Sequence, residues 1–342
     1  MDGLLMAPKI RPTRSALQAT TVLNEQRHNQ DGSKNPNHLH VGNIRRFSVR
    51  RPPYFRIMLS PSSPLVLRGH TGAVYDATWV HALQAWCSAG GDGVVARWKW
   101  GEADGHAVFH HSSPFYAVCA WGDSVVAGNA TGELFAHWGT QHVVTHEHKA
   151  SVFALHADAS GVLWSGDGEG HIRAWERRDH ALQSTLHIPT ALGKIRHIGP
   201  HPSGLIVAGG SGAWAILDTT QKRVHPVTTH DRSCYWAMHL PEKDVVISGG
   251  QDGKLVACQG ESPVLDLALH QSAIYRGVRV GEMLWTAGRD KDVKAWDIHS
   301  LEAAGKLPRP HTRSVNALAL GGPEGRHLVT GGDDRTLKVW TL

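Results

Sequence analysis

The chain has 342 residues, of which 41% are hydrophobic, and a formal net charge of +5. No run of about 18 or more apolar residues occurs, which excludes a helical membrane span, and no apolar segment near the start is long enough for a secretory signal. The basic charge belongs to one end, since residues 1–57 carry a net charge of +7 and residues 58–342 a net charge of −2. The high isoelectric point therefore gives no reason to predict nucleic-acid binding by the larger part of the chain.

Residues 1–57 are predicted to be a disordered basic leader. They contain no Trp, no Cys and no repeat, and a stretch rich in Asn, Gln, His, Arg and Pro cannot bury enough apolar surface to fold alone. Three interpretations stay open: a basic arm that contacts nucleic acid or a membrane, an organelle transit peptide, or a natural translation start at Met58. We favour the start at Met58, because it lies shortly before the first strand expected in the fold.

Residues 58–342 contain seven repeats of about forty residues, which end at residues 98, 137, 175, 217, 258, 296 and 340. Each repeat ends in strand, tight turn and strand, with small residues and an acid in the turn and alternating apolar residues beside it. The clearest copies are residues 87–98, 285–296 and 329–340. A histidine lies 26 to 29 residues before the end of every repeat except the fourth, where Ala191 takes its place.

This pattern resembles the WD-repeat family of β-propellers over residues 64–342. In that family each repeat forms one four-stranded blade, and the blades surround a central channel. The resemblance therefore implies an all-β, seven-bladed propeller for residues 58–342. The seventh repeat ends without an outermost strand, and the apolar residues 65–67 are expected to supply it. Pairing of this N-terminal strand with the last blade would remove two open sheet edges.

Ser or Thr, His and an acid recur at fixed spacing in five repeats, four of which also contain Trp. A catalytic triad occurs once per active site, so five copies favour a structural role over catalysis. The family resemblance implies one hydrogen-bond chain inside each blade, and buried polar groups need such partners. The chains are predicted to contain His70, Ser88, Asp92 and Trp98; His148, Ser165, Glu169 and Trp175; His230, Ser248 and Asp252; His270, Thr286, Asp290 and Trp296; and His311, Thr330, Asp334 and Trp340.

Three repeats depart from this pattern. In the fifth, Cys258 replaces the Trp. The second and fourth repeats lose most of the set, and we expect their blades to be held by packing alone and to be the least stable. Their residues at the Ser, Asp and Trp positions are Ala127, Thr131 and His137, and Val207, Ser211 and Leu217.

All four tyrosines of residues 58–342 lie five residues after a repeat histidine. The seven residues at this position are Tyr75, Tyr116, Phe153, Arg196, Tyr235, Tyr275 and Asn316. Tyrosine favours strands and fills a crowded inner edge, which is one interpretation. The other, which we favour, is a circle of aromatic side chains presented to a partner, because the resemblance implies that this end of the channel binds partners. Arg289 and Asp333 are expected on the same edge.

The sequence thus predicts a non-catalytic interaction scaffold that binds a protein or peptide at the channel mouth, as a monomeric propeller within a larger complex. No cofactor and no metal site are predicted, and four cysteines that resemble buried thiols fit a cytoplasmic protein. One alternative is an enzyme built on a propeller frame, although the channel positions carry aromatics, Arg and Asn rather than paired acids. The other is a nucleic-acid-associated protein that uses the basic leader.

Overall fold

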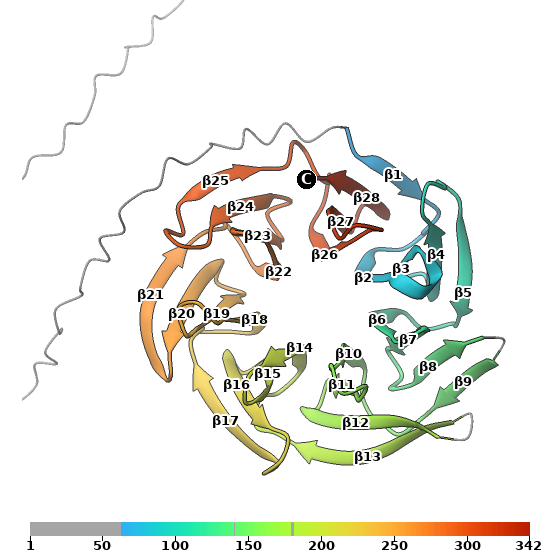
Figure 1. The fold of residues 1–342 in the computed structure, drawn as a ribbon, viewed down its shortest axis with the longest axis horizontal. Coiled ribbons are helices and arrows are strands. Elements are labelled where there is room, and N and C mark those ends of the chain that lie inside the picture. Colours follow the sequence, from blue (N-terminus) through green and yellow to red (C-terminus); the bar gives the residue numbers. More distant parts are fainter. Residues whose placement is uncertain (1–62, 140, 179–180) are drawn as a thin grey trace, which may run out of the picture. The chain divides into compact units, whose positions relative to one another are not determined.

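The computed structural model describes residues 63–139, 141–178 and 181–342, which form seven four-stranded antiparallel sheets arranged as a ring (Figure 1). The expectations for residues 1–57 lie outside the described residues. The predicted all-β, seven-bladed propeller is confirmed. One short 3-10 turn, η1 (His81–Leu83), connects two strands of the first blade. No helix of the described residues is long and apolar enough to cross a membrane.

Within each blade the strands run antiparallel from the channel outward. The first three blades contain β2 (Val74–Val80), β3 (Ala85–Gly90), β4 (Val94–Lys99) and β5 (Gly105–His110); β6 (Phe115–Trp121), β7 (Ser124–Asn129), β8 (Leu134–Trp138) and β9 (Gln141–Thr145); and β10 (Val152–Ala157), β11 (Leu163–Asp167), β12 (His171–Arg178) and β13 (Ala181–Pro189).

The next three blades follow the same order. They contain β14 (Ile195–His201), β15 (Gly204–Gly209), β16 (Ala213–Asp218) and β17 (Arg223–Thr228); β18 (Cys234–Leu240), β19 (Val245–Gly250), β20 (Lys254–Gln259) and β21 (Ser262–Ala268); and β22 (Ile274–Val280), β23 (Met283–Gly288), β24 (Val293–Asp297) and β25 (Ala303–Lys306). The seventh blade contains β26 (Val315–Gly321), β27 (His327–Gly332), β28 (Thr336–Thr341) and β1 (Leu65–Arg68).

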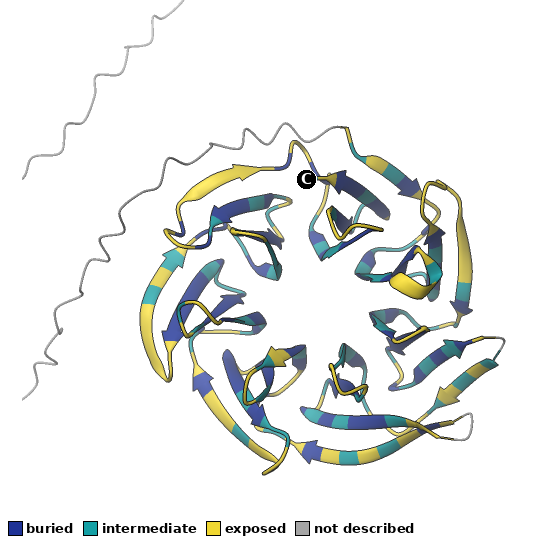
Figure 2. Cartoon of the chain, in the orientation of Figure 1, coloured by how far each residue is buried: buried dark blue, intermediate teal, exposed yellow. Residues whose placement is uncertain are grey.

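The core is divided into seven apolar clusters, one between each pair of neighbouring blades. The second strand of a blade is covered on both faces by its neighbours, so β3 is buried along its whole length. The outermost strand has no such cover, and β25 is exposed along its whole length (Figure 2). Strands buried on both faces need continuous apolar runs, which explains why the repeats were easiest to recognise around their second and third strands.

The ring closes as predicted. Strand β1 pairs antiparallel with β28, and Leu67 lies opposite Leu337 (Figure 1). The side chain of Leu67 is 1% exposed and joins the apolar cluster between the seventh and first blades. The first strand is therefore part of the last sheet, and it covers an edge that would otherwise have unpaired backbone groups.

We expect Leu67→Ala to lower the free energy of unfolding by about 2–5 kcal/mol, because the substitution leaves a cavity in the contact that closes the ring. Urea unfolding followed by tryptophan fluorescence measures this. Leu65→Ala is the matched control: Leu65 lies on the same strand but is 44% exposed, so its loss should change stability by no more than about 0.5 kcal/mol. Equal effects of the two substitutions would contradict a closing role for Leu67.

Candidate functional site

The residue predicted at the channel mouth is the second residue of the innermost strand in every blade, and it lies in a β-bulge. In the first blade Val74 pairs with Gly90 and Asp76 with Ala89, so Tyr75 between them has no partner on β3. The same register shift occurs at the start of β6, β10, β14, β18, β22 and β26. A bulge redirects a side chain away from the regular alternation of its strand.

One backbone hydrogen bond fixes each bulge to the turn that follows the second strand. The N–H of Gly91 donates to the carbonyl of Ala73, two residues before Tyr75, at 2.7 Å. Equivalent bonds of 2.8 to 3.0 Å occur in the other six blades, where the donors are Ala130, Gly168, Gly210, Gln251, Arg289 and Asp333. The bulge and its turn therefore form one rigid unit that is repeated seven times.

The seven bulge residues lie around the channel mouth, and we call them the channel rim: Tyr75, Tyr116, Phe153, Arg196, Tyr235, Tyr275 and Asn316. All are half-buried. The ring centroids of Tyr75 and Tyr116 lie 5.2 Å apart, and those of Tyr116 and Phe153 lie 4.9 Å apart with the rings stacked. These are ordinary distances for favourable aromatic pairs.

An arginine continues the sequence of rings. The guanidinium of Arg196 lies 5.2 Å from the ring centroid of Phe153 and 5.1 Å from that of Tyr235, so it is held between two aromatic faces. The ring of Tyr235 in turn contacts that of Tyr275 at 5.0 Å, edge to face. Six of the seven rim side chains thus form two linked stacks around the channel.

Of the two residues expected on the same edge, Arg289 lies in the turn that is bonded to the bulge of Tyr275, and Asp333 contacts the rim residue Asn316. The side-chain amide of Asn316 donates to the carboxylate of Asp333 at 2.7 Å and to the carbonyl of Val74 in the first blade at 3.1 Å. Burial, together with Tyr116 and Asp333, raises the pKa of Tyr75. Its hydroxyl therefore stays protonated at neutral pH and can donate a hydrogen bond to a ligand.

The turns beside the rim divide it into two sectors. In the first four blades the turn residue is small: Gly91, Ala130, Gly168 and Gly210. A Cβ atom on Gly91 would lie 3.1 Å from the ring of Tyr75, so a larger residue there would crowd the ring. In the last three blades the turn residues are Gln251, Arg289 and Asp333, which carry long or charged side chains. The turn residues beside the rim are therefore small in the first four blades and long or charged in the last three.

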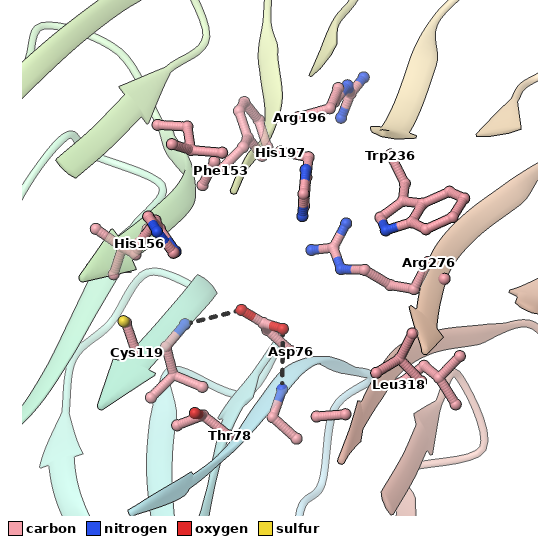
Figure 3. Close-up of a pocket in the computed structure, with 18 of the residues that line it drawn as sticks. Asp76, Thr78, Cys119, Phe153, His156, Arg196, His197, Trp236, Arg276 and Leu318 are labelled. Carbon is pink, nitrogen blue, oxygen red and sulfur yellow. Dashed lines mark hydrogen bonds between the residues drawn. The ribbon is translucent and has the colours of Figure 1, made fainter. Parts of the chain in front are cut away.

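Below the rim the channel contains a cavity of about 360 Å³. Its lining includes Asp76, His197 and Arg276, each directly after a rim residue in the sequence (Figure 3). The sequence analysis missed this layer. The signal was present at the position after each rim residue, but Asp, His and Arg each occur there in only one blade, so no repeat pattern identifies these three residues as a set.

Burial changes the ionisation of this second layer. The carboxylate of Asp76 accepts hydrogen bonds from the N–H groups of Ala77 at 3.0 Å and Val118 at 3.1 Å. Its pKa is nevertheless raised, because burial outweighs Arg276 and these two donors. Burial, with Arg276 nearby, lowers the pKa of His197 to about 3, so its ring is neutral at physiological pH. The Nδ1 atom of His197 has no hydrogen-bond partner among the described residues.

The predicted hydrogen-bond chain is present in the first blade. The hydroxyl of Ser88 lies 2.8 Å from Nε2 of His70 and accepts from Nε1 of Trp98 at 2.8 Å, while Nδ1 of His70 lies 3.0 Å from Asp92. Because Trp98 donates to the hydroxyl and Asp92 accepts from Nδ1, the hydroxyl proton points to Nε2. The sixth and seventh blades contain the same bonds with Thr286 and Thr330, and the fifth contains them without a Trp. Ser88 is fully buried, which leaves no access for a substrate.

The third blade uses a different acid from the one predicted. Nδ1 of His148 lies 2.8 Å from the carboxylate of Asp167, and Glu169 points outward with 56% of its side chain exposed. Asp167 occupies the last residue of the second strand, where the first blade has Gly90. From there the shorter side chain reaches the histidine directly. The assignment of Glu169 was therefore wrong, because it was based on the usual place of the acid in the turn.

In the second blade too, a polar residue replaces the glycine at the end of the second strand. The expectation that packing alone holds this blade was therefore wrong. Asn129 occupies the position of Gly90, and its side-chain amide lies 3.4 Å from Nδ1 of His111. Glu133 accepts from Asn129 and lies 3.4 Å from Nε2 of His111. A polar network of different composition thus replaces the usual one.

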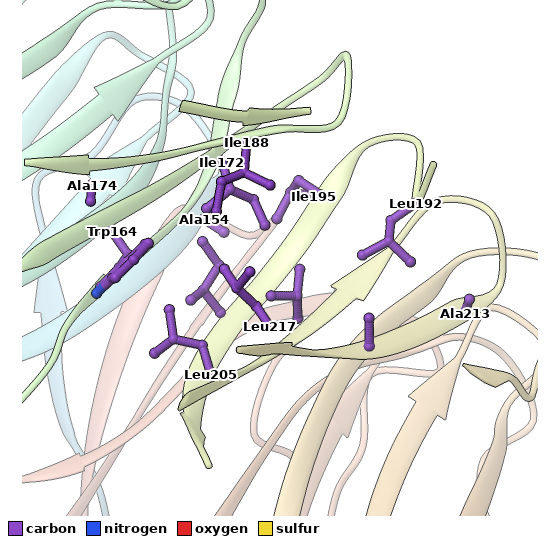
Figure 4. Close-up of a cluster of buried hydrophobic side chains, with 13 residues drawn as sticks. Ala154, Trp164, Ile172, Ala174, Ile188, Leu192, Ile195, Leu205, Ala213 and Leu217 are labelled. Carbon is purple, nitrogen blue, oxygen red and sulfur yellow. The ribbon is translucent and has the colours of Figure 1, made fainter. Parts of the chain in front are cut away.

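The fourth blade is held by packing. Leu192, not Ala191, fills the space of the missing histidine, since it lies against Gly209 as His70 lies against Gly90. It joins a cluster that includes Ile195, Leu205 and Leu217 (Figure 4).

The cysteines agree with the prediction of buried thiols in three of four cases. Cys87, Cys234 and Cys258 are buried, whereas Cys119 is half-buried and lines the cavity. Burial raises the pKa of Cys87 and of Cys119 to about 12, so both remain protonated thiols at neutral pH.

We expect Asp167→Asn to lower the free energy of unfolding at pH 7 by about 2 kcal/mol. Burial alone would raise the pKa of Asp167, but hydrogen bonds from His148 and from two N–H groups outweigh it and lower the pKa to about 2. A lowered folded-state pKa stabilises the protein at neutral pH, and this contribution is lost as the pH falls from about 4 to about 2. Urea unfolding at several pH values measures both effects.

Glu169→Gln is the matched control for this substitution, because Glu169 is two residues away and mostly exposed. It should change stability by no more than about 0.5 kcal/mol. A larger loss from Glu169→Gln than from Asp167→Asn would restore the original assignment.

The lower stability of the fourth blade stays a prediction. Its second and third strands, β15 and β16, should exchange their amide hydrogens faster than β3 and β4 of the first blade, because it lacks a polar network among its described residues. Native-state hydrogen exchange followed by mass spectrometry measures this. Equal or greater protection of β15 and β16 would show that packing compensates fully.

Comparisons with known proteins agree with this architecture. Residues 305–341 match the model of the WD domain, G-beta repeat, which covers the seventh repeat. The chain is 27% identical over 235 residues to actin-interacting protein 1 of Drosophila melanogaster, which covers 65% of this chain and 37% of that protein. It is 23% identical over 242 residues to cilia- and flagella-associated protein 52 of Sus scrofa, with 64% and 38% covered.

A third relative is meiotic fizzy-related protein 1 of Schizosaccharomyces pombe, at 23% identity over 281 residues, with 80% of this chain and 58% of that protein covered. The chain therefore spans between 37% and 58% of the length of these three relatives. The seven sequence repeats, the seven blades with their closing first strand, and the matched repeat lead to the same conclusion. The chain resembles the WD-repeat β-propeller family in its repeats and in its fold, and residues 305–341 match the repeat of that family.

Proposed function

We propose that this propeller is a non-catalytic scaffold that binds a segment of a partner protein at the channel rim. The observation that carries the proposal is the rim itself: in all seven blades a bulge presents one side chain at the same edge, and four of the seven are tyrosines. Tyrosine provides a large contact area at low entropic cost, with a hydroxyl that can donate a hydrogen bond, and it is enriched where proteins bind.

The rim is half-buried and already packed in the free protein. Its rings contact one another at 4.9 to 5.2 Å, so little side-chain freedom is lost when a ligand binds. The small turn residues of the first four blades leave space beside the rim, as at Gly91, where a Cβ atom would crowd the ring of Tyr75. An extended segment with an apolar side chain suits this sector.

The names of the relatives agree with an interaction role. One is described as actin-interacting and another as cilia- and flagella-associated. Because the chain covers less than two thirds of these proteins and identity is low, they support the class of function and not a particular partner. The recurring Ser or Thr, His and Asp sets are buried and repeated, which disfavours an enzyme that uses them. We place the protein in the reducing cytoplasm, as one propeller within a larger assembly, since its described cysteines are free thiols.

Substitution of Tyr75, Tyr116, Tyr235 and Tyr275 by Ala tests the proposal. We expect loss of the main partner in affinity purification of the full-length protein followed by quantitative mass spectrometry, because truncation of an aromatic hot spot costs about 2 kcal/mol or more per residue. The four corresponding Phe substitutions should weaken binding less, because they remove only the hydroxyls.

Trp100→Ala is the control, since Trp100 is 37% exposed and lies after the third strand of its blade, away from the rim. Its partners should be those of the unchanged protein. Retention of all partners by the four-Ala variant, with unchanged circular dichroism and thermal midpoint, would remove the proposal.

A further inference from the structure

Two arginines at and below the rim form no ion pair among the described residues, although Arg276, against the larger effect of burial, acts to lower the pKa of Asp76. Arg196 stacks between Phe153 and Tyr235, and its Nε atom is buried without a hydrogen-bond partner among the described residues. Arg276 donates only one hydrogen bond in the part of the chain that the structure describes, to the carbonyl of Tyr275 at 3.2 Å. Neither forms an ion pair there with a carboxylate. A buried or half-buried guanidinium is usually paired, and its planar fork suits a carboxylate.

Both arginines line the same cavity. Figure 3 shows the guanidinium of Arg276 directed into it, between the side chains of His197 and Asp76. Burial lowers the pKa of Arg196, and the nearby guanidinium of Arg276 contributes to the same shift. The positive charge is therefore concentrated at one place rather than balanced within the wall.

The single acidic side chain among the described lining residues does not neutralise this charge. The carboxylate of Asp76 is occupied by the N–H groups of Ala77 and Val118. Two guanidinium groups and one carboxylate leave the cavity with a net positive charge. The neutral ring of His197 adds a further polar atom without a partner, Nδ1.

We propose that the bound segment inserts an acidic side chain through the rim, and that its carboxylate pairs with the guanidinium of Arg276 in the cavity. This inference rests on the proposed function and adds the chemistry of the anchor: an Asp or Glu beside an apolar residue that packs on the rim rings. A carboxylate carries a single negative charge, which one planar fork can match.

The cavity also has room and apolar walls for the methylene groups of such a side chain. Its volume of about 360 Å³ is at the lower end of ligand sites. Val118, Ile198 and Leu318 contribute apolar surface to its lining. The carboxylate end can therefore meet Arg276 while the stem of the side chain contacts these residues.

A library of random twelve-residue peptides displayed on phage, selected against the full-length protein, tests the inference. We expect enriched peptides to contain an Asp or Glu whose replacement by Asn or Gln weakens binding about thirtyfold or more, because the change leaves a desolvated charge unpaired. Arg276→Gln should cause a similar loss. In a double-mutant cycle the two changes should be far from additive, which a purely structural role of Arg276 would not produce.

Two further variants sharpen the test. Arg279→Gln is the matched control, since Arg279 lies on the same strand but pairs with Glu242 at 2.7 Å, and it should leave peptide binding unchanged. Asp76→Asn should tighten binding of acidic peptides, because it removes a repelling charge. Circular dichroism and thermal midpoints confirm that each variant is folded.

The outcomes separate this inference from the proposed function. Enriched peptides that require the rim tyrosines but contain no acidic residue would overturn the inference and leave the function standing. Binding of free N-acetylglutamate amide or inorganic phosphate in the cavity, with no acidic peptide selected, would also overturn it. If no peptide requires the tyrosines, both proposals fail.

Discussion

The β-bulge at the start of each innermost strand is the constraint on which the site depends. It places one unpaired residue at the inner edge of every blade, and the hydrogen bond from the following turn fixes that residue in position. Without the bulge the strand would alternate regularly, and neighbouring rim residues would not converge. The fold therefore provides the rim position in each blade, and the residue at that position determines the chemical character of the rim there.

This difference between positions set by the fold and residues set by the sequence explains which features could be predicted from the sequence. Repeated features were predictable, because the same burial and the same turn recur in each blade: the blade number, the closing strand, the rim position and most of the hydrogen-bond chains. The misassigned acid had a local cause. Asp167 replaces a strand-end glycine, so the polar group moves from the turn into the strand while the composition of the repeat remains similar.

The cavity could not be predicted from the sequence, for a different reason. Asp76, His197 and Arg276 come from three blades, whereas three of the other four blades have Ala at this position, so no shared polar residue type marks the layer as a repeat. A feature built from differences between repeats disappears when repeats are aligned. Positions that differ between repeats can nevertheless give a propeller its specificity for a ligand, because the positions shared by all repeats carry residues that are needed for packing.

The pairing of β1 with β28 joins the earliest strand of the propeller to the last one synthesised. During translation the first strand must remain without its partner until the final strand has emerged from the ribosome. A product that stops early would leave an open edge and an interrupted circle of side chains around the channel.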